Sequence, residues 1–210
     1  MNKSYPKVVC PKCNARIGHP GPCPNCSSYT GELIQEAIDL ANAVHRSQYR
    51  QGGCKPPYIV HCVGVLNKLI KWGVEDPFVL AASVLHDTLE DGEDLSSISA
   101  EIEKRFGPKI LKYVEELTYL PEKQEKKDYI SSFKDKSDGS LIVKIADRIY
   151  NVEDFYFICK DQKYATKYLI KAGDLFEIFY NRSLEERFEK LRENIEKDIF
   201  KAAKLVVYGS

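Results

Sequence analysis

From Thr30 onward, hydrophobic residues recur every three or four positions, which is the spacing of one face of an α-helix. Prolines and glycines divide this pattern into segments, because both residue types favour helix ends. The segments predict helices over residues 30–51, 58–72, 78–86, 94–106, 110–117, 128–133, 141–157, 163–180 and 184–207. No long stretch alternates with period two, so the sequence predicts an all-α main domain.

Residues 1–28 depart from this pattern, since they are rich in proline, glycine and cysteine and have few large hydrophobic side chains. They contain two Cys-x-x-Cys turns, formed by Cys10 with Cys13 and by Cys23 with Cys26. Four thiolates in two tight turns suit tetrahedral zinc, and zinc would supply the folding free energy that a segment without a core lacks. We therefore predict a structural zinc ribbon over residues 1–28, with a redox pair or unrelated thiols as the alternatives. Its few lysines permit a nucleic-acid or protein partner without establishing one.

The composition narrows the class of protein further. Hydrophobic residues make up 43% and charged residues 30%, which is enough apolar material for a core. Lys+Arg and Asp+Glu balance at 31 each, so no overall charge favours nucleic acid or a membrane surface. No apolar run is long enough to span a bilayer, and the N-terminus does not read as a signal peptide. Seven cysteines without a secretion signal favour reduced thiols and a cytoplasmic protein.

Histidines and carboxylates gather at two places in the helical part. His86 and Asp87 end an apolar run, and Glu90 and Asp91 follow within two helical turns. Repulsion among three carboxylates opposes such an arrangement unless a cation relieves it. Further on, Asp147 lies in an apolar helix and shares one face of it with two polar residues, Lys144 and Asn151. Either motif alone is more often structural, but together they favour a divalent metal site.

These motifs carry a family resemblance. The segment 30–157 resembles the HD-domain metal-dependent phosphohydrolases, and most of all the hydrolase module of alarmone (ppGpp) synthetase–hydrolases and the small stand-alone alarmone hydrolases. The matching stretches occur in the family's order: Ala43–Arg50, Pro57–His61, Ala81–Asp91, Phe106–Gly107 and Lys144–Asn151. The resemblance implies an HD-domain helical bundle, which we assign to residues 30–207, with the zinc ribbon outside it.

The resemblance also implies roles for individual residues. The metal ligands fall on His61, His86, Asp87 and Asp147, and the metal of this group is typically manganese. The catalytic acidic pair falls on Glu90 and Asp91. The nucleotide contacts fall on Arg50, Lys144 and Asn151. The implied reaction removes the 3′-pyrophosphate from guanosine tetra- or pentaphosphate and leaves GDP or GTP.

Two positions depart from the family pattern. Cys62 follows the first ligand where the family often has proline, and Gln51 stands where a basic residue is common. Two alternatives therefore stay open: an HD phosphohydrolase acting on another nucleotide, and a non-catalytic nucleotide-binding adaptor with a zinc ribbon. Retention of all the ligands and both acidic residues argues against the adaptor. The chain has no room for a synthetase domain, so we expect no synthesis.

Four further features receive structural predictions. His45 is expected either to hold the residues that bind the metal, without binding the metal itself, or to pack in the core. Arg148 is expected to form a structural ion pair, and residues 122–136 to be a solvated loop, with a lid as the alternative. The aromatic stretch 155–157 is expected to pack in the core. The scattered Cys54, Cys62 and Cys159 carry no catalytic signal.

Overall fold

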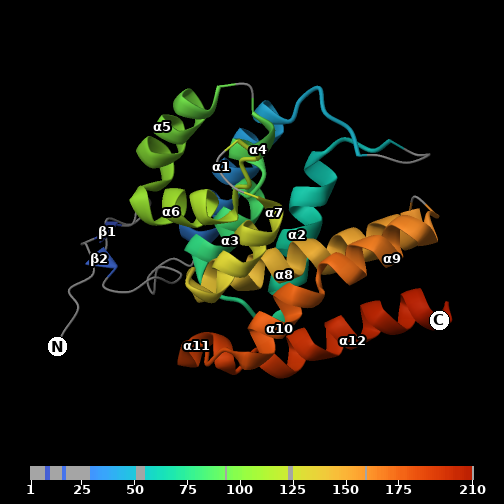
Figure 1. Ribbon diagram of the computed structural model, residues 1–210. Coiled ribbons are helices and arrows are strands. Elements are labelled where there is room, and N and C mark those ends of the chain that lie inside the picture. Colours follow the sequence, from blue (N-terminus) through green and yellow to red (C-terminus); the bar gives the residue numbers. More distant parts are fainter. Residues whose placement is uncertain are drawn as a thin grey trace.

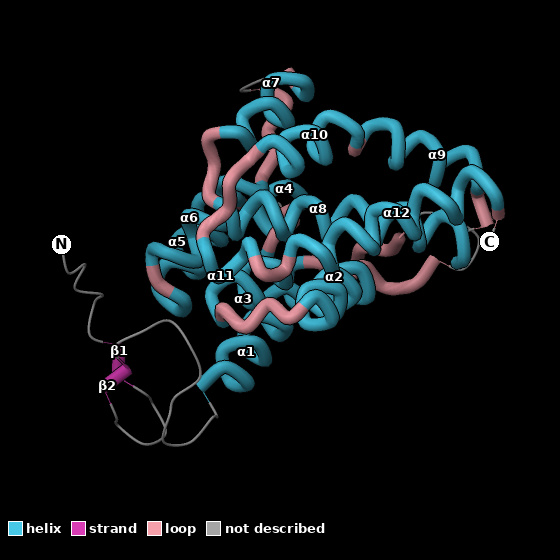
Figure 2. The backbone as a smooth tube through the Cα atoms, turned by 90° about the horizontal axis from the view of Figure 1, so that it is seen from below, coloured by secondary structure: helices cyan, strands magenta, loops and turns pink. Residues whose placement is uncertain are grey.

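The computed structural model describes residues 8–9, 16–17, 29–50, 55–92, 94–122, 125–158 and 160–209. These residues are mostly helical, as Figures 1 and 2 show. Two strands of two residues each, β1 (Val8–Val9) and β2 (Arg16–Ile17), pair antiparallel. The prediction of an all-α main domain is confirmed. The cysteines of the predicted zinc ribbon (Cys10, Cys13, Cys23 and Cys26) lie outside the described residues.

Most of the helices follow one another with short connections, whereas a long one joins α1 to α2 (Figure 1). Their bounds are α1 (Tyr29–Val44), α2 (Ile59–Trp72), α3 (Pro77–Leu85), α4 (Thr88–Asp91), α5 (Leu95–Phe106), α6 (Pro108–Leu117), α7 (Lys126–Ser131), α8 (Asp138–Glu153), α9 (Gln162–Lys171), α10 (Gly173–Asn181), α11 (Glu186–Glu189) and α12 (Arg192–Tyr208). The 3₁₀ turn η1 (Ser132–Lys134) follows α7, and the π-helical turn η2 (Asp154–Ile158) continues α8. None of the described helices is both long and apolar enough to cross a bilayer.

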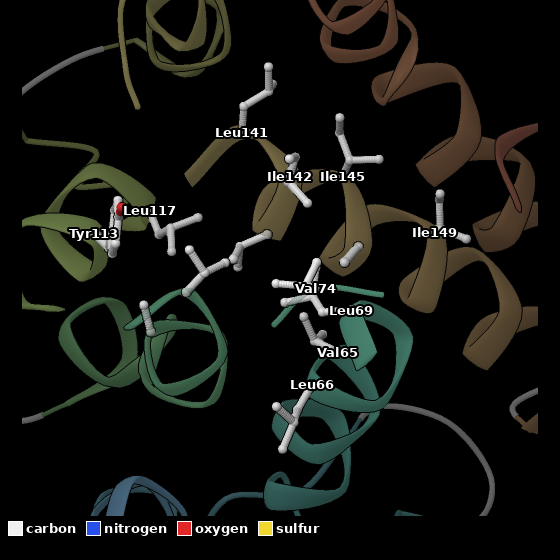
Figure 3. Close-up of a cluster of buried hydrophobic side chains, with 14 of the residues drawn as sticks. Val65, Leu66, Leu69, Val74, Tyr113, Leu117, Leu141, Ile142, Ile145 and Ile149 are labelled. Carbon is white, nitrogen blue, oxygen red and sulfur yellow. The ribbon is translucent and has the colours of Figure 1, made fainter. Parts of the chain in front are cut away.

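The helix α8 lies at the centre of the core. It packs against α2, α3, α6, α9 and α12. Its Leu141, Ile142, Ile145 and Ile149 are buried, and Figure 3 draws them in one hydrophobic cluster with Val65, Leu66 and Leu69 of α2 and Leu117 of α6. The helix α3 is buried along its whole length, so the residues that follow it emerge from the middle of the core. Burial of these apolar faces is the main favourable contribution to folding, and it fixes α2, α3 and α8 relative to one another.

The first helix ends at Val44, so the prediction that it continues to residue 51 is wrong. The chain turns away because residues 48–50 pair instead with residues 56–58. The backbone nitrogen of Arg50 donates to the Pro56 carbonyl at 2.9 Å, and that of Tyr58 donates to the Gln48 carbonyl at 3.0 Å. This pairing places the polar residues after α1 beside the start of α2.

Two more predicted helices are each divided in two. The segment 163–180 bends at Ala172, where α9 ends, and α10 then turns to pack against α7 and η1. The segment 184–207 forms the short α11 and then α12. Hydrophobic residues still recur every three or four positions across both breaks, because each half of the segment buries its own face on the same core.

The short helix predicted over residues 128–133 is confirmed, and the polar segment 122–136 around it is therefore not simply a solvated loop. Its described part contains α7 and η1, and it buries Tyr129, Ile130 and Phe133. The prediction for 155–157 is confirmed for Phe155, which is buried, and wrong for Phe157, which is 59% exposed.

Asp198 on α12 holds the C-terminal helix against α2. Its carboxylate accepts hydrogen bonds from Trp72 Nε1 at 2.8 Å and from the ammonium groups of Lys68 and Lys71, each at 3.3 Å. Lys68 also pairs with Glu153 at the end of α8 at 3.0 Å. This buried network ties α12, α2 and α8 together, so it stiffens the two helices that carry His61 and Asp147.

Candidate active site

Three buried side chains from three helices converge at one point. His61 lies in the first turn of α2, His86 directly follows α3, and Asp147 lies in the middle of α8. His61 Nε2 is 3.2 Å from His86 Nε2 and 3.3 Å from Asp147 Oδ1, and His86 Nε2 is 4.0 Å from the same oxygen. These atoms all lie within 4.8 Å of one another, so the three residues form a group that can hold a metal ion.

Asp87 adds a second carboxylate to this group. Its Oδ2 atom lies 3.0 Å from His86 Nε2 and 3.5 Å from His61 Nε2. The structure thus brings together all four residues that the sequence suggested as metal ligands.

The chemistry of the donor atoms fits a divalent cation. His86 Nδ1 lies 2.8 Å from the Ser83 carbonyl oxygen, which can only accept, so Nδ1 carries a hydrogen and Nε2 is the nitrogen left to bind a cation. Donor atoms about 2.1 Å from one cation lie roughly 3.0–3.5 Å from one another, close to most of the spacings among these side chains. Two imidazoles and two carboxylates suit manganese, zinc or a similar borderline ion.

The electrostatics keep both carboxylates ionised. Burial alone would raise the pKa of Asp147, but Lys144 and Arg148 hold that pKa well below its ordinary value. Burial likewise opposes ionisation of Asp87, whose pKa is nevertheless lowered, mainly by His86. Burial would lower the pKa of Lys144, but Tyr129 and Asp147 raise it, so the ammonium stays charged. Anionic oxygens therefore face the point where the four side chains meet.

Asp147 is held from both sides along α8, as the shared helix face predicted. Lys144 Nζ lies 3.2 Å from Asp147 Oδ2. Asn151 Nδ2 donates to Asp147 Oδ1 at 2.5 Å and to the Asp147 carbonyl at 3.0 Å. Both side chains are buried, so in this structure they orient a carboxylate of the cluster.

Arg50 reaches the same helix face from the loop after α1. Its Nη2 donates to Asn151 Oδ1 at 2.5 Å, and Nε and Nη2 both donate to Asp154 Oδ2, at 3.1 Å and 2.9 Å. Sequence reasoning missed Asp154 as the partner of Arg50. The only sequence signal is its position seven residues after Asp147, which is two turns along the same helix face.

The acidic pair lies beside the cluster on α4. Glu90 and Asp91 are both accessible to solvent. Glu90 Oε2 accepts a hydrogen bond from the backbone nitrogen of Tyr119 at 3.1 Å. Partial burial raises the pKa of Glu90, and burial together with the charge of Asp87 raises that of Asp91. A carboxylate with a raised pKa next to a cation site is suited to exchanging protons with water.

His45 does not join the metal group. It is buried, its ring stacks on Tyr58 with centroids 4.7 Å apart, and the Tyr58 hydroxyl donates to Asp87 Oδ2 at 2.7 Å. His45 therefore contacts the site through Tyr58 and not directly, which is one of the two roles predicted for it. Arg148 Nε lies 3.9 Å from Asp147 Oδ2, and this contact supports the structural ion pair expected for it.

A basic cavity of about 400 Å³ has walls from α7, α8, α9 and α10, and the carboxylate of Asp174 also lines it. Arg148 lines it and also contacts Asp147. The other cations that line it are Lys126, Lys127, Lys167 and Lys171. Tyr164 and Tyr168 add two aromatic rings. The pKa of Lys126 is lowered, first by burial and then by the charge of Arg148. The cavity can therefore accept a multiply charged anion.

Comparisons with known proteins agree with this geometry. The sequence model of the HD domain matches residues 37–182. Mouse guanosine-3′,5′-bis(diphosphate) 3′-pyrophosphohydrolase MESH1 is 37% identical over 125 residues, which cover 58% of this chain and 68% of the mouse protein. The guanosine-3′,5′-bis(diphosphate) 3′-pyrophosphohydrolase of Aquifex aeolicus is 30% identical over 138 residues, or 63% of this chain and 19% of that protein.

A solved structure is also similar in fold. It is described as a metazoan ortholog of SpoT that hydrolyzes ppGpp and plays a role in starvation responses. The match has a TM-score of 0.63 at 25% sequence identity and covers 79% of this chain and 94% of the other.

Proposed function

This chain belongs to the HD-domain family, and from that premise we propose that it is a metal-dependent phosphohydrolase that removes the 3′-pyrophosphate of guanosine tetra- or pentaphosphate. The observation that carries the proposal is the convergence of His61, His86, Asp87 and Asp147. These residues would hold a divalent cation, which we propose to be Mn²⁺. When bound, such an ion supplies Lewis-acid activation of a phosphoryl group and of water.

The acidic pair supplies the proton chemistry. Glu90 is accessible to water, its raised pKa eases proton exchange, and the Tyr119 backbone nitrogen fixes its carboxylate. We assign Glu90 the role of orienting the attacking water and taking its proton, with Asp91 beside it as the second carboxylate.

We propose that Arg50, Lys144 and Asn151 contact the nucleotide. In this structure they also hold Asp147 and Asp154. The Arg50 side chain is 10% exposed, so it can offer a substrate only the part of the guanidinium that is not paired with Asp154. Lys144 offsets negative charge next to the reacting phosphate.

The basic cavity supports a substrate with several phosphates. A pyrophosphate group brings concentrated negative charge. Five cations and one carboxylate, that of Asp174, line this cavity, and one of the cations, Arg148, contacts Asp147. The two tyrosine rings offer faces on which a flat group can stack. The same lining also fits other nucleotide polyphosphates, so the choice of substrate must be tested directly.

The test is a substrate screen with the full chain and added Mn²⁺. Guanosine tetra- and pentaphosphate are compared with NADPH and common nucleoside triphosphates, and released pyrophosphate and phosphate are measured. We expect pyrophosphate together with GDP or GTP. Turnover of another nucleotide alone would reassign the substrate, and binding without turnover of any would favour the adaptor.

We further propose that residues 1–28 are a structural zinc ribbon and that residues 30–207 are the hydrolase domain. The antiparallel pairing of Val8–Val9 with Arg16–Ile17 supports this division, because Cys10 and Cys13 lie between the two strands in sequence. Metal analysis of the protein used in the substrate screen measures its zinc content and its manganese content separately.

Removing two charges from the basic cavity is expected to weaken substrate binding more than catalysis. In the double variant Lys126→Gln/Lys167→Gln we expect KM to rise about 10- to 30-fold, since each accessible charge contact contributes about 0.7–1 kcal/mol, while kcat changes little. Steady-state kinetics at fixed ionic strength measure both constants. The matched control is Lys112→Gln/Lys197→Gln, which removes two lysines of exposed helical ion pairs. An equal rise in KM in the control would rule out a specific role for the cavity.

A further inference from the structure

Tyr58 contacts one of the candidate ligands at the atom that faces the cation site. It directly precedes α2, and its hydroxyl donates to Asp87 Oδ2 at 2.7 Å. The same oxygen lies 3.0 Å from His86 Nε2. The phenol thus interacts with the oxygen that points into the cluster. A phenol carries its hydrogen at neutral pH, so it is a permanent donor.

The phenol ring is held in place by the loop that follows α1. The His45 ring stacks on it at 4.7 Å with an angle of 30° between the planes. The Arg50 guanidinium carbon lies 5.6 Å from the ring centroid. Two groups from the same loop therefore fix the direction in which the hydroxyl points.

The same loop reaches the acidic pair through Gln48. Its Nε2 donates to the Asp91 carbonyl oxygen at 2.9 Å, which leaves Oε1 as the acceptor facing His45 Nδ1 at 2.6 Å. His45 therefore donates from Nδ1, and its position is coupled to that of α4. The polar side chains of His45, Gln48 and Tyr58 therefore join the end of α1 to both ends of α4.

We propose that Tyr58 is a positioning residue for the metal centre, which holds the Asp87 carboxylate in the orientation that a bound cation requires. The proposal rests on the proposed function, since it takes Asp87 as a ligand. Asp87 lies between α3 and the short α4, at the N-cap of α4, so its side chain needs an external partner to select one rotamer. A hydrogen bond from an outer residue is how ligating carboxylates are commonly oriented.

The test is Tyr58→Phe in the full chain, which removes the hydroxyl and keeps the ring that stacks on His45. We expect Mn²⁺ affinity to fall about 10-fold or more, within the range for loss of an outer hydrogen bond to a ligand, with little change in the melting temperature. Titration with Mn²⁺ followed by electron paramagnetic resonance gives the affinity, and Co²⁺ absorption reports the ligand geometry. At saturating Mn²⁺ we expect kcat to recover partly while KM changes little.

The control is Tyr113→Phe, which removes another mostly buried hydroxyl, from α6. We expect its metal affinity and Co²⁺ spectrum to match the wild type. Unchanged metal affinity and spectrum in Tyr58→Phe would overturn the role of Tyr58. A wild-type protein that binds Mn²⁺ but hydrolyses no nucleotide would overturn only the proposed function. A wild-type protein that binds no Mn²⁺, Co²⁺ or Zn²⁺ at the cluster would overturn both.

Discussion

Replacing Asp147 with asparagine is expected to abolish manganese-dependent turnover while the fold is retained. Asp147 Oδ1 faces His61, and Oδ2 pairs with Lys144. Asparagine keeps the shape but removes the charge that a cation requires. Loss of several kcal/mol of metal-supplied stabilisation corresponds to a fall in kcat of about 10³-fold or more. Kinetics with added Mn²⁺ and a Mn²⁺ titration measure the two effects, and circular dichroism checks the fold.

The matched control is Asp138→Asn, since Asp138 is a second buried aspartate on α8. It pairs with Arg182 at 2.7 Å, away from the metal group. Breaking a buried ion pair destabilises a protein by about 3–5 kcal/mol, so both variants are expected to melt earlier. Only Asp147→Asn is expected to lose metal and turnover. If turnover in Asp147→Asn stays within a few-fold of the wild type, our site assignment is wrong.

Replacing Glu90 with glutamine is expected to lower kcat by about 10²- to 10⁴-fold, the range for loss of a positioned general base. Metal binding is expected to be retained, because Glu90 lies outside the metal group. A base must be ionised, and the pKa of Glu90 is raised, first by burial. As the pH is lowered, the activity of the wild type should therefore begin to fall at a pH above the ordinary glutamate pKa. This decrease should be absent in the variant. Pre-steady-state rates across pH, at saturating Mn²⁺, measure the effect.

Asp91→Asn is the comparison that separates the two members of the acidic pair. If Glu90→Gln retains turnover and Asp91→Asn loses it, the proton-handling role belongs to Asp91. If both retain turnover, neither carboxylate acts on the attacking water. Metal analysis of each variant distinguishes these results from a simple loss of the cation.

The sequence by itself determined the helical class. Helical spacing is a local property, because each turn is set by residues three and four positions apart. The candidate ligands His61, His86, Asp87 and Asp147 were named by the resemblance of their motifs to the HD-domain family. The sequence could not show that the four meet. Their convergence depends on how the apolar faces of α2, α3 and α8 pack against one another.

The tertiary structure alone decided the surroundings of that group. Arg50 and Asp154 are 104 positions apart, and Tyr58 and Asp87 are 29 apart, so no periodic pattern relates them. The early end of α1 at Val44 arises because residues 48–50 pair with residues 56–58, a competition that helical spacing does not reveal. The basic cavity likewise needs α7, α8 and α9 side by side. Local spacing sets which faces are buried, whereas the packing of those faces sets which polar groups meet.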